Sequence, residues 1–194
     1  MKIWSKTILN IYRYLERVAN AIDKIVLSRA TNSFYTSSSN MSFNGVWNVS
    51  QDIINLTSRK VNLINLKLIT EEALSCVDEG LAKVLILNFI EKRTCYECAE
   101  ILNVSLRTYF RKINKALESF GKALNRHEYD KEYFDKMLTD EMWILEVKNK
   151  MAKNQDIFEI NNRFAKKICC DLKKNKTLND VTPQFHNNLS LWVF

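Results

Sequence analysis

The stretch TCYECAEILNVSLRTYFRKINKA, residues 94–116, decides the fold of this chain because it encodes two helices joined by a tight turn. Thr94 can accept a hydrogen bond from the backbone N–H of Glu97, and the Glu97 carboxylate can reach back to the Thr94 amide, which predicts a capping box. Asn103 tolerates the left-handed backbone of a turn, and Ser105 is a preferred cap for the second helix. This order of caps and turn is typical of a helix-turn-helix.

Each of the two helices has an apolar face at helical spacing. In the first helix this face holds Cys98, Ala99 and Leu102, and the small Ala99 lets the partner helix come close. Val104 fills the space between the helices. The predicted buried positions of the second helix are Leu106, Tyr109, Ile113, Ala116, Leu117, Phe120 and Leu124.

The opposite face of the second helix is strongly basic. From Ser105 to Arg126 there are six Lys or Arg (107, 111, 112, 115, 122 and 126) and one acid, Glu118, a local balance of +5 in a chain of net charge +7. Positive charge concentrated on one surface is what binding to nucleic-acid phosphates requires. An ordinary helical hairpin with a solvated basic face is the alternative. We favour DNA binding because caps, small residue, turn and charge occur together at the required spacing.

The segment from Leu81 to Leu117 resembles the promoter-recognising C-terminal domain of bacterial sigma factors, often called region four. In that family an apolar helix precedes the pattern T-x-x-E-[IV]-A-x-x-L-x-[VI]-[ST], and here VLILNFIEKR precedes the opening stretch. The resemblance covers about a fifth of the chain. Many phage and plasmid regulators have the same pattern. The matching framework positions include Glu97, Ala99, Leu102, Val104, Ser105, Ile113 and Ala116.

The resemblance implies roles for individual side chains. Arg107 and Arg111 would face bases, and Lys112 and Lys115 would face phosphates. Position 110, which faces DNA in the family, is Phe here; it could contact a thymine methyl group or be covered by the C-terminal half of the protein. Tyr109 replaces a core Val or Ile. The candidate DNA-binding residues are therefore Arg107, Thr108, Phe110, Arg111, Lys112, Lys115 and Arg126.

Composition predicts a globular, all-α protein. The 194 residues are 46% hydrophobic and 26% charged, which excludes a disordered chain, and three Gly with one Pro are too few for a sheet protein with many tight turns. We expect a helical bundle containing the helix-turn-helix, with long N-terminal helices and extra C-terminal helices.

The chain divides into three predicted regions. Residues 1–76 comprise a helix over about 3–27, a Ser-rich loop over 28–48 and a long helix over about 50–76. Residues 77–126 hold the helix-turn-helix domain, whose leading helix is capped by Asp78 and runs to Lys92. Residues 127–194 are expected to form one helix over 131–153 and another over about 155–173, and the apolar tail 189–194 is expected to dock on the fold or on a partner.

Cysteine and histidine usage points away from metal and enzyme chemistry. Five cysteines, an odd number, predict reduced thiols, and the pair Cys95 and Cys98 lacks further ligands at zinc-site spacing. With two distant His and no Gly-rich phosphate loop, we expect neither a catalytic site nor a bound metal or cofactor.

The sequence thus predicts a sequence-specific DNA-binding transcription regulator, cytoplasmic because no signal peptide or membrane span is visible. Double-stranded DNA is the expected partner; RNA polymerase and a second copy of the chain are left open, and no membrane is expected. One alternative is a sigma factor proper acting with RNA polymerase, although residues 1–76 lack a recognisable aromatic-rich promoter-melting region. The other is a helical protein–protein adaptor, with Phe110 and the acidic segment 128–159 as its binding surface. An exposed Phe110 and Arg111 would favour DNA over the adaptor.

Overall fold

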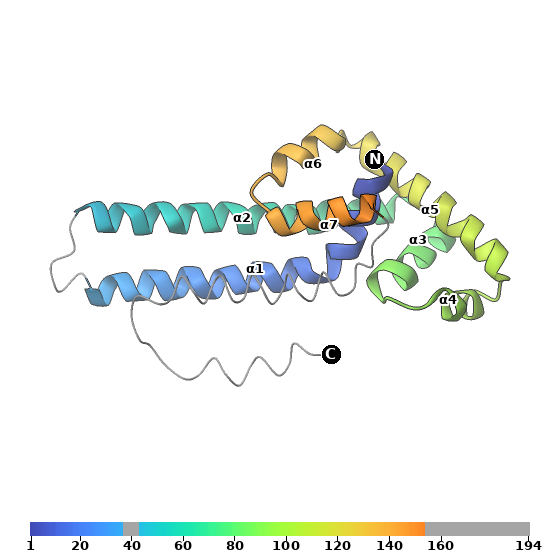
Figure 1. Ribbon diagram of the computed structural model, residues 1–194, viewed down its shortest axis with the longest axis horizontal. Coiled ribbons are helices and arrows are strands. Elements are labelled where there is room, and N and C mark those ends of the chain that lie inside the picture. Colours follow the sequence, from blue (N-terminus) through green and yellow to red (C-terminus); the bar gives the residue numbers. More distant parts are fainter. Residues whose placement is uncertain (37–42, 154–194) are drawn as a thin grey trace.

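Two long antiparallel helices, α1 (Lys2–Thr36) and α2 (Phe43–Ser75), lie side by side and form an arm (Figure 1). The computed structural model describes residues 1–36 and 43–153, and every element in these ranges is helical. At one end of the arm lie α3 (Glu79–Leu85), the π-helical segment η1 (Ile86–Ile90), α4 (Cys95–Ile101) and α5 (Leu106–Arg126), and α6 (Lys131–Met137) and α7 (Met142–Ala152) follow. The expected all-α helical bundle is confirmed.

The apolar stripe of α1 forms much of the core, as its spacing predicts. Ile8, Ile11, Leu15, Val18 and Ile22 are buried. They face Leu56, Leu63, Leu66 and Ile69 of α2 in one hydrophobic cluster. None of the helices in the described ranges combines the length and hydrophobicity needed to cross a lipid bilayer.

The predicted loop over 28–48 is wrong at both ends. Helix α1 continues to Thr36, and α2 already begins at Phe43. The hydroxyl of Thr31 donates to the carbonyl of Leu27 at 3.0 Å, a local bond that lets a polar residue stay helical. Arg29 also forms an ion pair with Asp52 of α2 at 2.6 Å, so tertiary contacts support helix where the composition indicated a loop.

The segment that leads into α4 also differs from the prediction. Asp78 caps α3 as expected, accepting from the backbone N–H of Leu81 at 3.2 Å, but the helix widens into η1 and ends at Ile90 rather than Lys92. Leu87 packs with Val84 in a small cluster beside α4, whereas Phe89 packs in the main core. Leu87 and Phe89, two positions apart, thus lie on opposite faces of the segment and enter different clusters.

The predicted single helix over 131–153 is wrong, because α6 and α7 are separate helices. Asp130 caps α6, and the chain turns between Leu138 and Glu141. Glu141 is 1% exposed; its carboxylate accepts from the guanidinium of Arg59 on α2 at 2.8 and 3.2 Å and from the indole N–H of Trp143 at 2.8 Å. The turn between α6 and α7 thus places the Glu141 carboxylate inside the fold, against α2. The predicted helix over 155–173 and the tail 189–194 lie outside the described residues.

The described parts of the three predicted regions share one hydrophobic core. Side chains of α1, α2, α3, α5, α6 and α7 belong to the same cluster, including Trp4, Phe120 and Phe134. Gly121 of α5 is buried, and a Cβ at this position would lie 3.2 Å from the Ser5 hydroxyl of α1. Glycine thus permits a close approach of α1 to α5, which holds α5 against the arm.

Candidate nucleic-acid interface

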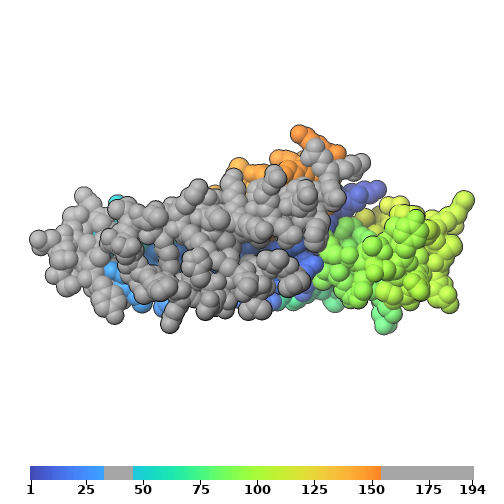
Figure 2. All heavy atoms as spheres, turned by 60° about the horizontal axis from the view of Figure 1, so that its bottom comes forward, coloured from blue at the N-terminus to red at the C-terminus, as the bar shows by residue number. Residues whose placement is uncertain are grey.

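Helices α3, α4 and α5 gather at one end of the molecule, beyond the arm. Figure 2 shows them in green to yellow as a continuous surface at that end. The first half of α5 packs in a small cluster with residues of α3, η1 and α4, and its second half belongs to the main cluster, which includes α1, α2 and α3. The first half of α5 is therefore the part presented at the tip of the molecule.

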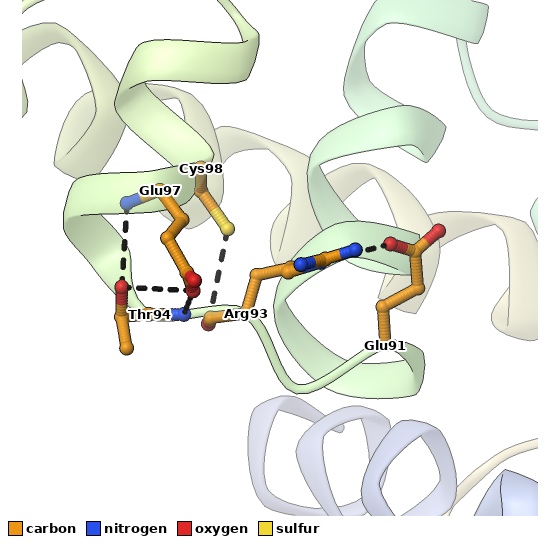
Figure 3. Close-up of polar contacts among 5 residues, drawn as sticks. All are labelled: Glu91, Arg93, Thr94, Glu97 and Cys98. Atoms are coloured by element: carbon orange, nitrogen blue, oxygen red, sulfur yellow. Dashed lines mark hydrogen bonds and ion pairs between the residues drawn. The ribbon is translucent and has the colours of Figure 1, made fainter.

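The start of α4 is held by the predicted capping box (Figure 3). The backbone N–H of Glu97 donates to the Thr94 hydroxyl oxygen at 3.3 Å, and the backbone N–H of Thr94 donates to the Glu97 carboxylate at 2.8 Å. The backbone and hydroxyl bonds from Thr94 hold the pKa of Glu97 below its ordinary value. The carboxylate thus stays ionised and anchors the first turn of α4.

The turn between α4 and α5 has the geometry that the sequence predicts. Asn103 is in the left-handed region with φ 50°. Its N–H donates to the carbonyl of Glu100, and the N–H of Val104 donates to the carbonyl of Ala99, both at 2.9 Å. This pair of bonds is a Schellman motif, which ends α4 and fixes the direction in which the chain enters α5.

The first turn of α5 is capped by Ser105. Its hydroxyl oxygen accepts from the backbone N–H of Thr108 at 3.3 Å and lies 3.0 Å from the Thr108 hydroxyl. Thr108 is exposed, so this candidate DNA-binding residue reaches the surface while its hydroxyl is oriented by the cap.

A small separate core fixes the angle between α4 and α5. Cys98, Ala99 and Tyr109 are buried in it, and Leu102, Val104, Leu106 and Ile113 are partly buried around them. The Tyr109 hydroxyl donates to the side-chain oxygen of Asn88 at 2.7 Å, and burial raises the pKa of Tyr109. Tyrosine fits at this position, where the sigma-factor pattern that the sequence resembles has Val or Ile, because η1 supplies a partner for its hydroxyl.

The basic residues of α5 form a stripe opposite its buried face. Arg107, Arg111 and Lys115 are exposed and follow at four-residue steps, so they lie within an arc of about 80°. None of the three forms an ion pair with another residue in the described ranges, whereas Lys122 pairs with Glu118 at 3.1 Å. The stripe therefore offers unneutralised positive charge at its N-terminal end.

The remaining candidate residues differ in exposure and position. Phe110 is 51% exposed and meets the ring of Tyr109 edge-on, so the described part of the C-terminal half, residues 127–153, does not cover it. Lys112 is only half-buried and keeps access to solvent. Arg126 is exposed in the last turn of α5, about 29 Å along the helix from Arg107, so it lies apart from the other candidates.

Lys92 is a residue that the sequence pattern did not single out. It has φ 60° in the turn before α4, and its ammonium donates to the side-chain oxygen of Asn10 on α1. Burial, with the nearby charge of Arg13, lowers the pKa of Lys92 to about 8. Lys92 therefore connects the α4–α5 unit to the arm, and no local motif encodes this contact.

This lysine predicts a pH dependence of stability. Because its folded pKa of about 8 lies below its unfolded value of about 10.4, the unfolded chain binds more protons between these values. The cost of burying the charged ammonium is thus fully present below pH 8 and is relieved as pH rises. From about pH 8 to about pH 10, we expect the free energy of unfolding of wild type, measured by chemical denaturation, to rise by about 1–3 kcal/mol relative to that of Lys92→Met. Exposed Lys83→Met should track wild type, and parallel wild-type and Lys92→Met profiles would contradict the assignment.

The cysteines of the C-x-x-C pair serve packing in this structure. Cys98 is buried in the small core, its thiol lies 3.9 Å from the carbonyl oxygen of Arg93, and burial raises its pKa. Cys95 is half-buried and is also a free thiol. Within residues 1–36 and 43–153, no three His, Cys, Asp or Glu side chains lie close enough to hold a metal ion together.

Comparison of the chain with protein-family models, with curated proteins and with solved structures finds no match.

Proposed function

We propose that this protein is a sequence-specific DNA-binding transcription regulator whose α4–α5 unit is a helix-turn-helix similar to region four of sigma factors. The observation that carries the proposal is the exposed, unneutralised stripe of Arg107, Arg111 and Lys115, opposite a fully packed face of α5. A regulator of this kind would act in the cytoplasm, on double-stranded DNA.

The dimensions of α5 support insertion of its first half into the major groove. An α-helix with its side chains is about 10–12 Å wide, and the major groove is about 12 Å wide. From Arg107 to Lys115 the stripe runs about 12 Å along the helix, which is enough to cross the groove once. The two arginines would donate in bidentate fashion to guanine edges.

The other candidates lie along the same helix, near the two arginines except for Arg126, which is in the last turn. Phe110 presents an apolar surface suited to a thymine methyl group, and Thr108 lies at the same end of the helix. Lys112, Lys115 and Arg126 would contact phosphates. The exposure of Phe110 and Arg111 favours DNA over an adaptor whose interface covers them.

The test separates base reading from phosphate binding. On a sequence selected from a random DNA pool, Arg111→Ala should cost about 1–3 kcal/mol of binding free energy and should cost little on unselected DNA. Lys115→Ala should weaken binding to both DNAs alike. Fluorescence anisotropy at several salt concentrations gives both quantities, and Lys83→Ala, an exposed lysine on α3, is the control.

Salt dependence decides whether phosphates are bound at all. The logarithm of affinity should fall with the logarithm of salt concentration by about one unit per phosphate contact, and Lys115→Ala should reduce this slope by about one. A flat salt dependence would overturn the proposal. Equal losses from Arg111→Ala on both DNAs would remove Arg111 from the base-reading set.

A further inference from the structure

Cys76, His127 and Glu72 form a polar cluster where the end of α2 meets the end of α5. The Cys76 sulfur lies 3.7 Å from Nε2 of His127, and Nδ1 of the same ring lies 3.6 Å from a carboxylate oxygen of Glu72. The imidazole therefore has a thiol at one ring nitrogen and a carboxylate at the other. None of these three residues belongs to the basic stripe of α5, so the proposed contact with DNA does not account for the cluster.

The two helix ends place these side chains. Cys76 follows α2 directly, and its N–H donates to the carbonyl of Glu72 at 3.2 Å, so the two side chains leave the last turn on the same face. His127 is the C-cap of α5, and its N–H donates to the carbonyl of Leu124 at 3.2 Å. The ring of Tyr129 stacks on that of His127 with the centroids 6.2 Å apart. The contact thus joins two positions that are 51 residues apart in sequence.

The cluster is open to solvent. Cys76 is exposed, whereas the other two cysteines in the described ranges, Cys95 and Cys98, are half-buried and buried. The side chains of His127 and Glu72 keep 35% and 50% of their surface in solvent. A small molecule can therefore reach the thiol and the imidazole together.

The arrangement has the three parts of an activated nucleophile: the nucleophile, its base and a group that orients the base. The carboxylate at Nδ1 favours the tautomer with the proton on that nitrogen, which leaves Nε2 free to accept the thiol proton. We propose that Cys76 is a reactive thiol that exchanges with small-molecule disulfides, with His127 as its base and Glu72 positioning the imidazole. This inference goes beyond the proposed function and does not depend on it.

The exchange balances without a further reagent. The Cys76 thiol passes its proton to Nε2 of His127 as the sulfur attacks one sulfur of the small disulfide. The disulfide bond of the small molecule breaks, and a new bond joins Cys76 to the sulfur that was attacked. The other half leaves as a thiolate and takes the proton from Nε2. Cys76 is thereby oxidised to a mixed disulfide, and the departing half is reduced to a free thiol.

The groups that face the imidazole suit this proton transfer. Burial, followed by the charge of Glu72, raises the pKa of Tyr129, so its hydroxyl stays protonated while the thiol reacts. The Glu72 carboxylate lies beside the positive charge that forms on His127 when the ring accepts the proton. This attraction favours the imidazolium, as in other sites where a carboxylate holds a catalytic histidine.

Modification by oxidised glutathione, read at each cysteine of the full-length chain by tryptic digestion and mass spectrometry, tests the proposal. At about pH 7, Cys76 should be modified about 10-fold faster than Cys95. His127→Gln should slow modification of Cys76 about 10-fold at this pH, because the base is lost. At about pH 10 an ordinary thiol is largely ionised and needs no base, so wild type and His127→Gln should agree within about twofold.

Two further variants test the role of the carboxylate. Glu72→Gln should slow the reaction at about pH 7 by less than His127→Gln does, and this loss should also disappear at about pH 10. Glu100→Gln removes an exposed carboxylate from α4 and should react like wild type. Circular dichroism of each variant should match that of wild type.

Three outcomes would overturn the proposal. Modification of Cys95 before Cys76 would show that Cys76 is not the reactive thiol. A loss in His127→Gln that is absent, or that is equal at both pH values, would show that His127 is not its base. A dimer linked through two copies of Cys76 on a non-reducing gel, in place of the glutathione adduct, would rule out a small disulfide as the reactant.

Discussion

Replacement of Glu141 by Ala is expected to lower the free energy of unfolding by about 3 kcal/mol. The Glu141 carboxylate is 1% exposed, and it holds Arg59 by two hydrogen bonds and Trp143 by a third. The bond to Glu141 is also the main reason why the pKa of Arg59 is raised. Removal of the carboxylate leaves a guanidinium and an indole N–H without their partner. The loss should lie at the low end for buried pairs, because the Arg59 side chain keeps 32% of its surface in solvent.

Urea denaturation followed by circular dichroism measures this loss. Glu132→Ala removes an exposed carboxylate from α6 and should change the free energy of unfolding by less than about 0.5 kcal/mol. The double variant Arg59→Met with Glu141→Leu should be more stable than Glu141→Ala, since it leaves no unpaired charge. If Glu141→Ala were as stable as wild type, the ion pair of Arg59 and Glu141 would contribute nothing to the contact between α2 and α7.

Phe120→Ala is expected to lower the free energy of unfolding by about 3–5 kcal/mol. Phe120 is 0% exposed and belongs to the core cluster that joins α5 to the arm. Truncation removes buried apolar surface and leaves a cavity between α5 and its neighbours. Affinity for DNA should fall together with stability, although every basic side chain of α5 is retained.

The same helix supplies a matched control for this variant. Phe110→Ala removes the same side chain ten residues earlier, where it is 51% exposed, and should cost less than about 0.5 kcal/mol of stability. Phe110→Ala should instead lower the affinity for DNA. Equal destabilisation by the two substitutions would show that Phe110 also packs in a core and is not available for contact with a base.

The elements predicted correctly depend on residues close together in sequence. The capping box of Thr94 and Glu97, the left-handed Asn103 and the Ser105 cap each act over three or four positions, so the pattern alone encodes them. The buried face of α5 follows from helical spacing in the same way. For this reason the position and exposed face of the candidate site could be predicted before the structure.

The errors arise where distant residues decide the outcome. Glu141 ends the predicted helix over 131–153 by facing inward toward Arg59, which is 82 positions earlier. The same separation divides Lys92 from Asn10. The extension of α1 through the Ser-rich segment is supported by Arg29 and its partner Asp52 on another helix. No local pattern contains these pairings, so propensity alone misplaced the boundaries.

The close approach of Ser5 to Gly121 bears on how this protein could be engineered or recombined. A fragment of residues 77–126, which the sequence predicts to be a domain, would be the obvious candidate for fusion to another protein. Such a fragment would expose Phe120 and Leu124, both of which belong to the cluster shared with α1 and α2. Residues 1–75 thus cover the buried face of α5, and a fusion protein that carries the α4–α5 unit must carry the arm with it.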